Sequence, residues 1–489
     1  MPITSGSLPA PSGPAASPPS DRLAPAHARR AALISSAAAM AGFLFGYDSA
    51  VINGAVSAIQ DHFAVGAAAT GLTVSAALLG SAAGALAGGA MAERLGRIRV
   101  MHIAAVLFMI SAVGSMFPFA LWDLACWRVV GGVAIGIASV IAPAYIAEVA
   151  PPAYRGRLGS FQQLAIVIGI ACSQLVNYAL TQFAGGSTTG HLLGVQAWQW
   201  MLGAAAVPAV VYLAVTLRIP ESPRWLASRG RTAEAASILE QLEGGAAQQR
   251  LAEIQASLGL ATQRRPSLRD LFGGRYGLLP IVWLGIALSV LQQFVGINVI
   301  FYYSSVLWQS VGINQTNSLL ISLSTSVINI VGTLVAIALV DRIGRKPLAV
   351  AGSVGMALSL GAVAWAFSGA SGSGTHLTLP ALQGVVALVA AHLFVLCFAF
   401  SWGVVVWVLL GEMFPNRIRA TALSLAATVQ WIANWAITVS FPSMAQWSLT
   451  FSYVMYAAFA AVSAVFAVKF LRETKGRTLE DMGGDSLPA

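Results

Sequence analysis

Long stretches without charged side chains run along most of the chain and predict membrane-spanning helices. Four runs are each long enough for one span: residues 31–60 (interrupted only by Asp48), 62–92, 100–122 and 129–147. Four longer runs are each long enough for two spans with a turn between them: 158–217, 276–340, 347–411 and 420–468. Because one span needs about 20 mostly apolar residues, the pattern predicts an all-α membrane protein with 12 spans.

The basic residues predict which ends of these helices face the cytoplasm, because cytoplasmic segments carry an excess of Lys and Arg. If both termini are inside, the tails, the central loop and the loops after even-numbered spans hold all but one of the 27 basic residues. The exception is Arg128, in the fourth span. We therefore expect a multi-pass protein of the inner (plasma) membrane with both termini in the cytoplasm.

Composition and charge agree with a membrane protein and exclude several other classes. The chain is 57% hydrophobic and 9% charged, whereas a soluble domain is about 25% charged. A soluble enzyme, a disordered chain and a nucleic-acid-binding protein are excluded on this basis. The net charge of +9 comes from the basic residues that hold the loops on the cytoplasmic side. Anionic lipid of the inner leaflet attracts the same residues.

One long polar insertion divides the spans into two groups of six. Apolar residues at helical spacing (Ile238, Leu239 and Leu242, then Leu251, Ile254 and Leu258) predict amphipathic helices within it. The expected organisation has five parts: a disordered cytoplasmic tail (1–30), a six-helix half (31–217), a cytoplasmic helical linker (218–275), a second six-helix half (276–471) and a cytoplasmic tail (472–489).

The two halves repeat each other at their charged edges. The segment Glu93-Arg94-Leu95-Gly96-Arg97 corresponds to Asp341-Arg342-Ile343-Gly344-Arg345. Likewise, Glu148, Pro151 and Arg155 correspond to Glu412, Pro415 and Arg419 at equal spacing. Internal repeats with a binding site at their interface are typical of secondary transporters.

Several motifs in order resemble the sugar porter branch of the major facilitator superfamily, over about residues 32–477. They are Gly42-Phe43-Leu44-Phe45-Gly46-Tyr47-Asp48, Pro143-Ala144-Tyr145-Ile146-Ala147-Glu148 with Arg155-Gly156, Pro220-Glu221-Ser222-Pro223-Arg224, Gln292-Gln293-Phe294-Val295-Gly296-Ile297-Asn298 and Glu473-Thr474-Lys475-Gly476-Arg477. The resemblance implies a major facilitator fold, with bacterial sugar–proton symporters and facilitative glucose transporters as the nearest likenesses.

The chain departs from the family pattern at a few positions. Glu93 replaces an Asp, Ile98 stands where a basic residue is common, and Arg472 replaces a Pro. In span 10, Val404 and Val405 follow Gly403 where the family commonly has a proline, which bears on the flexibility of that span.

A sugar site needs amides that donate and accept hydrogen bonds and aromatic rings for the apolar faces of the sugar. The resemblance implies that the pocket is lined by Gln163, Gln292, Gln293, Asn298, Asn329, Trp407 and Gln430, with Phe45 and Tyr302 or Tyr303 at its rim. The spacing of Gln292, Gln293 and Asn298 does not place all three on one helical face. A kink at Gly296 or different roles could reconcile them. The alternative is that buried amides hold helices together.

Asp48 and Arg128 are the two charges deepest in the predicted spans. An unpaired charge at the bilayer centre costs at least ~2.5–3.5 kcal/mol, so each is expected to pair with the other. If a conformational change separates them, Asp48 can take up a proton, which would couple proton and sugar movement. The alternative is a static ion pair between spans 1 and 4.

Charged residues at the cytoplasmic edge are interpreted as a gate that closes and opens the inner face. They are Arg94, Glu148, Arg155, Glu221, Arg224, Arg342, Glu412 and Arg419. Surface salt bridges of little energetic value are the alternative, but the repetition of the motif in both halves favours the gate.

These observations predict a transporter that imports a monosaccharide, glucose or another hexose, together with a proton by alternating access. The alternatives are a facilitator without proton coupling, a non-transporting sugar sensor and a membrane enzyme. We find no P-loop, nucleophile constellation or clustered metal ligands, so we expect no enzyme activity, catalytic residue, metal or cofactor. The expected partners are the monosaccharide, the proton and the lipid bilayer, with no nucleic acid, and a monomer by analogy.

Overall fold

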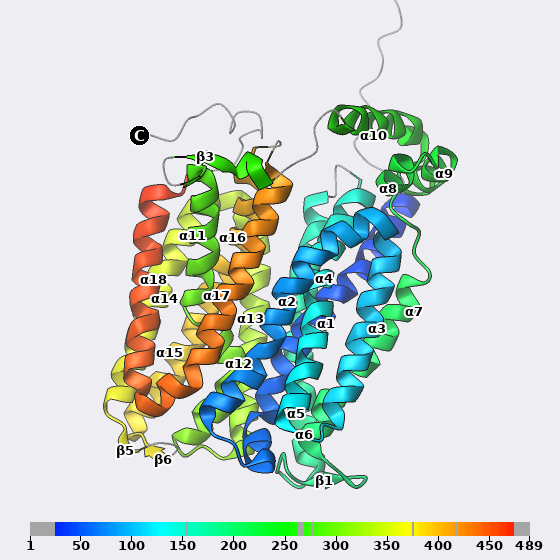
Figure 1. Cartoon of the computed structure of the whole chain (residues 1–489). Coiled ribbons are helices and arrows are strands. Elements are labelled where there is room, and N and C mark those ends of the chain that lie inside the picture. The colour runs from blue at the N-terminus through cyan, green and yellow to red at the C-terminus, as the bar shows by residue number, and fades with distance from the viewer. Residues whose placement is uncertain are drawn as a thin grey trace, which may run out of the picture.

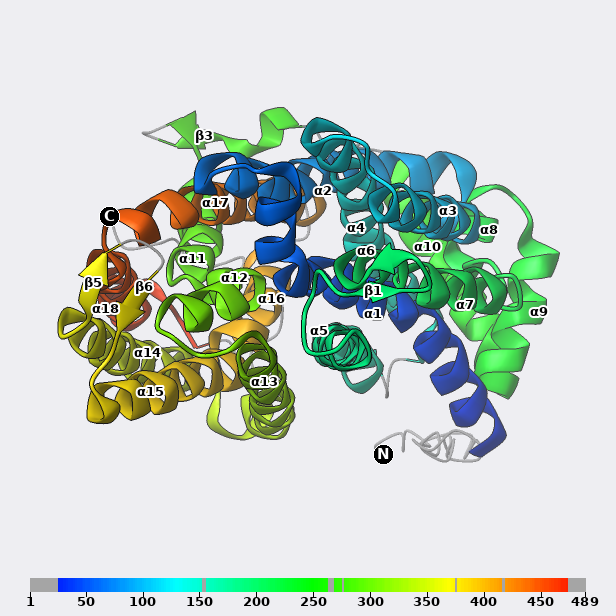
Figure 2. The same ribbon diagram turned by 90° about the horizontal axis from the view of Figure 1, so that it is seen from below.

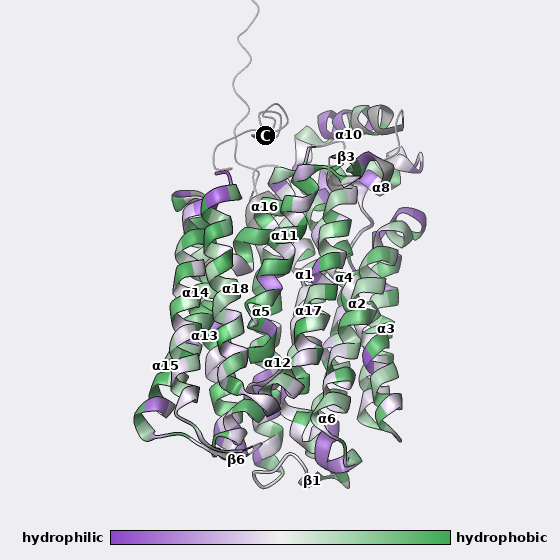
Figure 3. Ribbon diagram, turned by 60° about the vertical axis from the view of Figure 1, so that its left-hand side comes forward, coloured by the Kyte–Doolittle hydropathy of each residue, from purple (hydrophilic) through white to green (hydrophobic). Residues whose placement is uncertain are grey.

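The computed structural model describes residues 25–151, 155–262, 268–274, 277–373, 376–415 and 418–473. In these residues, 12 helical segments are long and apolar enough to cross a membrane, which confirms the predicted number. They form two bundles that lie side by side (Figures 1 and 2). Hydrophobic residues dominate the long helices, and hydrophilic residues gather mainly toward their two ends (Figure 3).

The first bundle contains spans 1–6, and the last of these is divided into two short helices. Its elements are α1 (Pro25–Phe63), α2 (Ala67–Leu95), α3 (Arg97–Met116), α4 (Leu121–Val149), α5 (Arg155–Phe183), β1 (His191–Leu192), β2 (Val195–Gln196), α6 (Ala197–Gly203) and α7 (Ala206–Thr216).

Glycines bring the backbones of this bundle into direct contact. A Cβ atom on Gly80 of α2 would lie 2.2 Å from the Val129 carbonyl oxygen of α4, and one on Gly132 of α4 would lie 1.9 Å from the Ala77 oxygen. A Cβ on Gly46 of α1 would similarly lie 2.0 Å from an α5 carbonyl oxygen. Small residues allow such close packing in membranes, and here they fix α1 and α4, the two helices that carry the predicted charge pair.

The linker between the bundles is helical, as the apolar spacing predicted. It contains α8 (Pro223–Ser228), α9 (Thr232–Glu243), the 3₁₀ helix η2 (Gly244–Ala246), α10 (Ala247–Thr262) and the 3₁₀ helix η3 (Leu268–Leu271). Leu239, Leu242, Leu251 and Ile254 are buried. Figure 1 shows α8–α10 against one end of the first bundle. On the outer surface of α9, a hydrogen bond from Arg231 lowers the pKa of Glu234.

The second bundle contains spans 7–12. Its elements are β3 (Phe272–Gly274), β4 (Gly277–Leu278), α11 (Pro280–Phe294), α12 (Ile297–Ser310), α13 (Gln315–Ile343), α14 (Arg345–Ser368), β5 (Ser371–Ser373), β6 (His376–Thr378), α15 (Ala381–Phe400), α16 (Trp402–Met413), α17 (Arg419–Trp447) and α18 (Leu449–Phe470). The strands form two-stranded antiparallel hairpins, β1–β2, β3–β4 and β5–β6.

Two spans of the second bundle are interrupted near their middle. Span 7 breaks at Gly296, whose φ of +83° lies in the left-handed region that favours glycine. Span 10 breaks at Ser401, although the chain lacks the proline that is common just after this point in the family. Trp402 anchors the second break, because its Nε1 donates to Ser353 Oγ at 2.7 Å and to the Ala349 carbonyl at 3.1 Å on α14.

The two bundles meet along three pairs of helices: α2 with α17, α5 with α13, and α1 with α12. We call the end of the molecule that carries α8–α10 the linker face, and the end that carries β1–β2 and β5–β6 the opposite face (Figure 1).

Candidate functional site

A buried ion pair lies within the first bundle. Arg128 Nη1 on α4 lies 3.2 Å from Asp48 Oδ2 on α1 and also donates to the Asp48 carbonyl oxygen at 3.3 Å. Asp48 is 5% exposed and Arg128 2%. The predicted pairing is therefore confirmed. Removing two charges from water is costly unless their geometry is good, so this contact must be held closely by the surrounding helices.

The glycine packing of α4 makes room for the carboxylate. A Cβ atom on Gly131 would lie 2.5 Å from Ser111 Oγ of α3 and 3.4 Å from Asp48 Oδ2. The Ser111 hydroxyl itself donates to the Trp127 carbonyl at 2.7 Å. A side chain at position 131 would thus collide with Ser111 of α3 beside the carboxylate of Asp48.

Three of the predicted sugar-binding amides form one hydrogen-bonded chain in the second bundle. Asn298 Nδ2 donates to Gln293 Oε1 at 2.6 Å, and Gln293 Nε2 donates to Gln292 Oε1 at 3.3 Å. Gln292 Nε2 donates in turn to the Trp402 carbonyl at 2.9 Å, just after the break in span 10. The break at Gly296 allows this arrangement, so the kink considered from the sequence explains how the three amides meet.

The other predicted pocket residues come from three further helices and from α16. Gln163 on α5 is half-buried, Asn329 on α13 is buried, and Gln430 on α17 is half-buried. The Oε1 atom of Gln430 is buried without a hydrogen-bond partner among the described residues, and a sugar hydroxyl could donate to it. Trp407 on α16 is 41% exposed, so its indole is open to a ligand or to lipid.

The predicted rim aromatics do not share one environment. Phe45 on α1 contacts Trp431 on α17 with ring centroids 5.4 Å apart, which joins the two bundles. Tyr303 is buried, and its hydroxyl donates to the Thr438 carbonyl of α17 at 3.1 Å. Tyr302 instead lines a small cavity with Ser49 and Arg128, beside the charge pair.

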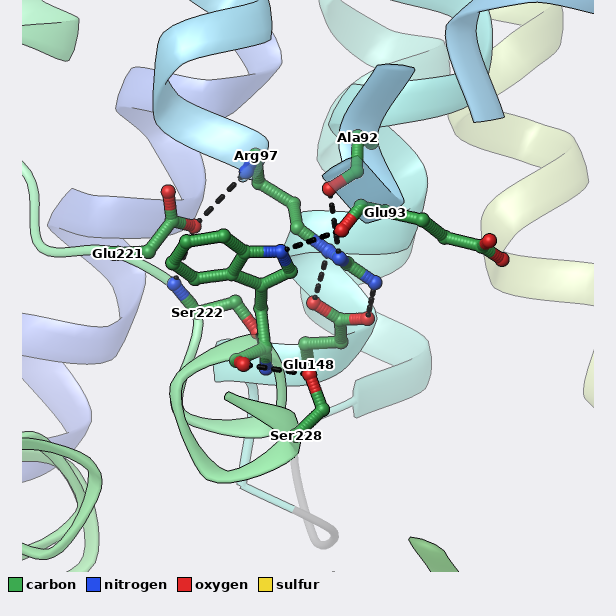
Figure 4. Close-up of polar contacts among 8 residues, drawn as sticks. Ala92, Glu93, Arg97, Glu148, Glu221, Ser222 and Ser228 are labelled. Carbon is green, nitrogen blue, oxygen red and sulfur yellow. Dashed lines mark hydrogen bonds and ion pairs between the residues drawn. The ribbon is translucent and has the colours of Figure 1, made fainter. Parts of the chain in front are cut away.

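At the linker face, an ion pair joins α3 and α4, two helices of the first bundle (Figure 4). Arg97 Nη2 lies 2.8 Å from Glu148 Oε1, and Arg97 Nε donates to Glu148 Oε2 at 3.0 Å. Glu221, just before α8, accepts from the backbone N–H groups of Arg97 and Ile98 at the start of α3. A carboxylate is favourable at a helix N-terminus, so Glu221 also fastens the linker to α3.

The second bundle repeats this arrangement. Arg345 Nη2 lies 2.8 Å from Glu412 Oε1, and Glu473 accepts from the backbone N–H groups of Arg345 and Lys346 at the start of α14. Each glycine between helices, Gly96 and Gly344, has a positive φ and lies against the capping carboxylate. The internal repeat seen in the sequence therefore extends to the three-dimensional contacts.

The structure adds three residues to these linker-face contacts that the sequence prediction missed: Arg97, Arg345 and Glu473. The two arginines follow the glycine of each repeat, and this position in the motif could have identified them. Arg94 and Arg342, which were predicted, are exposed, as is Arg224. Arg155 and Arg419 belong to the predicted gate as well, but their side chains are not among those that the structure describes.

At the opposite face, neutral residues join the two bundles directly. The Ser305 N–H of α12 donates to Asn53 Oδ1 of α1 at 2.9 Å, and the Ser305 hydroxyl donates to the Asn53 carbonyl. Gln315, at the start of α13, donates to Thr188 Oγ1 at 2.6 Å and accepts from its N–H at 3.0 Å. No signal in the sequence distinguished these residues from other polar residues of the spans.

In the described part of the chain, no group of three or more His, Cys, Asp or Glu side chains is placed to hold a metal ion.

Comparisons with known proteins agree with this arrangement. The family described as "Sugar (and other) transporter" matches residues 34–485. A glucose transport protein of Synechocystis sp. is 54% identical over 92% of this chain and 96% of its own length. The D-xylose-proton symporter of Escherichia coli is 37% identical over 92% of this chain and 94% of its own length. A solved structure of the E. coli xylose transporter, in a partially occluded inward-open conformation, superposes with a TM-score of 0.78 at 35% identity, covering 91% of this chain and 99% of that one.

Proposed function

Because the chain belongs to the sugar transporter family of the major facilitator superfamily, we propose that it imports a monosaccharide together with a proton by alternating access. Glucose or another hexose is the first candidate, since the glucose transport protein shares 54% of its residues with this chain. The protein is an integral membrane protein with 12 spans, and we place both termini in the cytoplasm on the strength of the basic loops.

The amide chain of the second bundle supports sugar binding. A sugar hydroxyl both donates and accepts, and each amide can do the same. Some of these donors and acceptors are used in the hydrogen bonds that link Gln292, Gln293 and Asn298 to one another. The others are available to a ligand. With Gln163, Asn329, Gln430 and Trp407 they are our proposed sugar site, and Phe45, Tyr302 and Tyr303 border it.

The observation that carries proton coupling is the buried Asp48–Arg128 pair against α12. Tyr302, which lines the same small cavity as Arg128, lies one helical turn from Asn298, so one short helix borders both sites. A nearby Arg favours the charged form of a carboxylate, and burial disfavours it. A movement that separates the pair would therefore let Asp48 take up a proton, and its return would expel that proton.

The contacts at the two faces support the direction of the movement. The hydrogen bonds that join the bundles at the opposite face keep that face closed in this conformation. At the linker face, Arg97–Glu148 and Arg345–Glu412 each join helices of one bundle. We propose that these pairs, with Glu221, Arg94, Arg155, Arg224, Arg342 and Arg419, form the cytoplasmic gate, which repacks when the opposite face opens to the outside.

Uptake of labelled glucose into proteoliposomes, with and without an inward proton gradient, tests this function. A symporter accumulates glucose transiently above the outside concentration, and a proton ionophore abolishes the accumulation. The Asp48→Asn variant should lose accumulation and keep exchange of labelled for unlabelled sugar. Asp61→Asn, the same change at an exposed position of α1, is the matched control and should behave as the unaltered protein.

The other outcomes select the rival functions. Equilibration without accumulation, unchanged in Asp48→Asn, would make the protein a facilitator with a structural ion pair. Binding of sugar without flux would make it a sensor. If glucose neither binds nor moves, a competition panel of pentoses, hexoses and polyols identifies the substrate. Light scattering of the purified protein tests whether it is a monomer.

A further inference from the structure

The small cavity beside the charge pair contains polar atoms that lack partners. It has room for about one water molecule, with a volume of about 10 Å³, and it lies between the two bundles. Its lining comes from α1, α2, α4 and α12: Ser49, Ile52, Val74, Ala77, Leu78, Arg128, Ile135 and Tyr302.

Two of the lining side chains have unsatisfied polar atoms. Arg128 Nε is buried without a hydrogen-bond partner among the described residues, and Ser49 Oγ has none there besides the neighbouring Tyr302 hydroxyl. Arg128 is 2% exposed and Ser49 8%. An unsatisfied donor on a buried charged group is expensive, and ordered water commonly supplies the missing partner in a polar cavity of this size.

The Tyr302 hydroxyl adds a third polar group at the cavity. It lies close to Ser49 and Asn434 and within electrostatic range of Arg128 and Asp48. Two further titratable groups lie near the pair in the described part of the chain, Tyr47 on α1 and, beside it, Cys172 on α5. Among these neighbours, Arg128 and Asp48 are the groups that carry formal charge when the tyrosines and the cysteine are protonated.

We propose that this cavity binds one water molecule, which accepts a hydrogen bond from Arg128 Nε and is held by Ser49 Oγ. The proposal rests on the proposed proton coupling and adds a positioning residue, Ser49, to it. When a proton from bulk water adds to the Asp48 carboxylate, Arg128 loses its counter-ion. The bound water is then the main partner of the buried guanidinium and interacts with it more strongly than beside the ion pair, so the water lowers the cost of the neutral form of Asp48.

Infrared difference spectroscopy of the purified full-length protein during a pH jump tests the water directly. A band of an internal O–H group should shift when H₂¹⁸O replaces ordinary water. This band should disappear in Ser49→Ala and persist in Ser35→Ala, a matched control because Ser35 is also a buried serine of α1 without a partner for its hydroxyl. A band that persists in Ser49→Ala, or the absence of an isotope-sensitive band in the unaltered protein, would overturn the proposal.

A transport assay tests the consequence. In Ser49→Ala, the pH of half-maximal proton-driven accumulation should move toward acid by about one unit, because Arg128 loses one charge-assisted hydrogen bond. Sugar exchange at saturating proton concentration should be unchanged. Val74→Ile, which extends an apolar side chain into the same cavity, should cause the same shift without removing a hydroxyl.

The proposed proton coupling and the proposed bound water can each be disproved without the other. If the unaltered protein does not accumulate sugar, proton coupling is wrong, and the isotope-sensitive band still decides whether the water is present. If accumulation occurs and both Ser49→Ala and Val74→Ile leave its pH profile unchanged, the water has no role in coupling.

Discussion

The two bundles carry different chemistry on differently built helices. In the first, α1, α2, α4 and α5 run unbroken, glycines bring their backbones together, and the buried charges Asp48 and Arg128 lie between them. In the second, spans 7 and 10 are interrupted at Gly296 and Ser401, and the polar groups at the breaks are neutral amides and backbone carbonyls.

The difference follows from the energetics of burying each kind of group. A charge pair is tolerated only where its geometry is fixed, because each charge depends on the other. Neutral amides can exchange partners, since each donates and accepts, and a helix break adds free backbone groups beside them. The first bundle is therefore suited to hold a proton site, and the second to bind a sugar with many hydroxyls. The following experiments test this division.

Disrupting the close backbone packing of the first bundle should cause the largest loss of stability. In Gly132→Leu, the new side chain begins 1.9 Å from the Ala77 oxygen, so α2 and α4 must separate. We expect a loss of more than about 5 kcal/mol and no folded protein, measured by size-exclusion chromatography of detergent extracts. Gly361→Leu on α14, where no atom lies within 4 Å of the new Cβ, is the control and should fold normally. Equal yields of both variants would contradict the packing argument.

Removing one partner of the Asp48–Arg128 pair should cause the second largest loss of stability. Arg128→Met leaves a buried carboxylate without a counter-ion and should destabilise the protein by about 3–5 kcal/mol. The double variant Asp48→Asn/Arg128→Met should recover most of this loss in a thermal melt, although it should not accumulate sugar. In the second bundle, Gln292→Met leaves two neutral groups without their partner, the Trp402 carbonyl and the Gln293 amide N–H, at a cost of about 1–3 kcal/mol each. A double variant no more stable than Arg128→Met would show that the charges do not depend on each other.

Two asparagines should separate sugar binding from helix packing. Asn298→Ala breaks the amide chain of the second bundle and should raise the KM for sugar about tenfold or more. Asn177 on α5 is fully buried and donates to the Val51 carbonyl at 3.0 Å in the first bundle. Asn177→Ala should lower the melting temperature and leave the KM unchanged. A raised KM in Asn177→Ala would mean that sugar recognition in the first bundle extends beyond Gln163 to the contact between α5 and α1.

The two ion pairs of the linker face, one in each bundle, should differ least in their contribution to stability. The side chain of Glu148 is 12% exposed and that of Glu412 is 30% exposed, so solvent screens the second pair more. Glu148→Gln should therefore cost more stability than Glu412→Gln, each no more than about 2 kcal/mol. Thermal melts at low and high salt measure both. The opposite order would mean that the two repeats are not equivalent in their energetics.

Much of the fold was predictable because its signals are local. Apolar runs predicted the 12 spans, and helical spacing predicted the linker helices. The charges Asp48 and Arg128 could be paired in advance because each was a deeply buried charge without an alternative partner. At the linker face, the repeat predicted Glu148 and Glu412 as contact points and the family motif predicted Glu221, but neither identified Arg97 or Arg345 as their neighbours. The choice between neighbouring arginines depends on the turn at a positive-φ glycine, which aims one arginine inward and leaves the other exposed.

By itself, the sequence determined that this protein crosses the membrane in two repeated halves and that one carboxylate and one guanidinium are buried together. These conclusions follow from hydrophobicity and charge, whose cost in a bilayer does not depend on detailed packing. Only the tertiary structure decided that Gln292, Gln293 and Asn298 meet across the break at Gly296, and that Asn53 and Ser305 join the bundles. A neutral polar group has many possible partners, and the approach of two helices to within a few ångströms selects one of them.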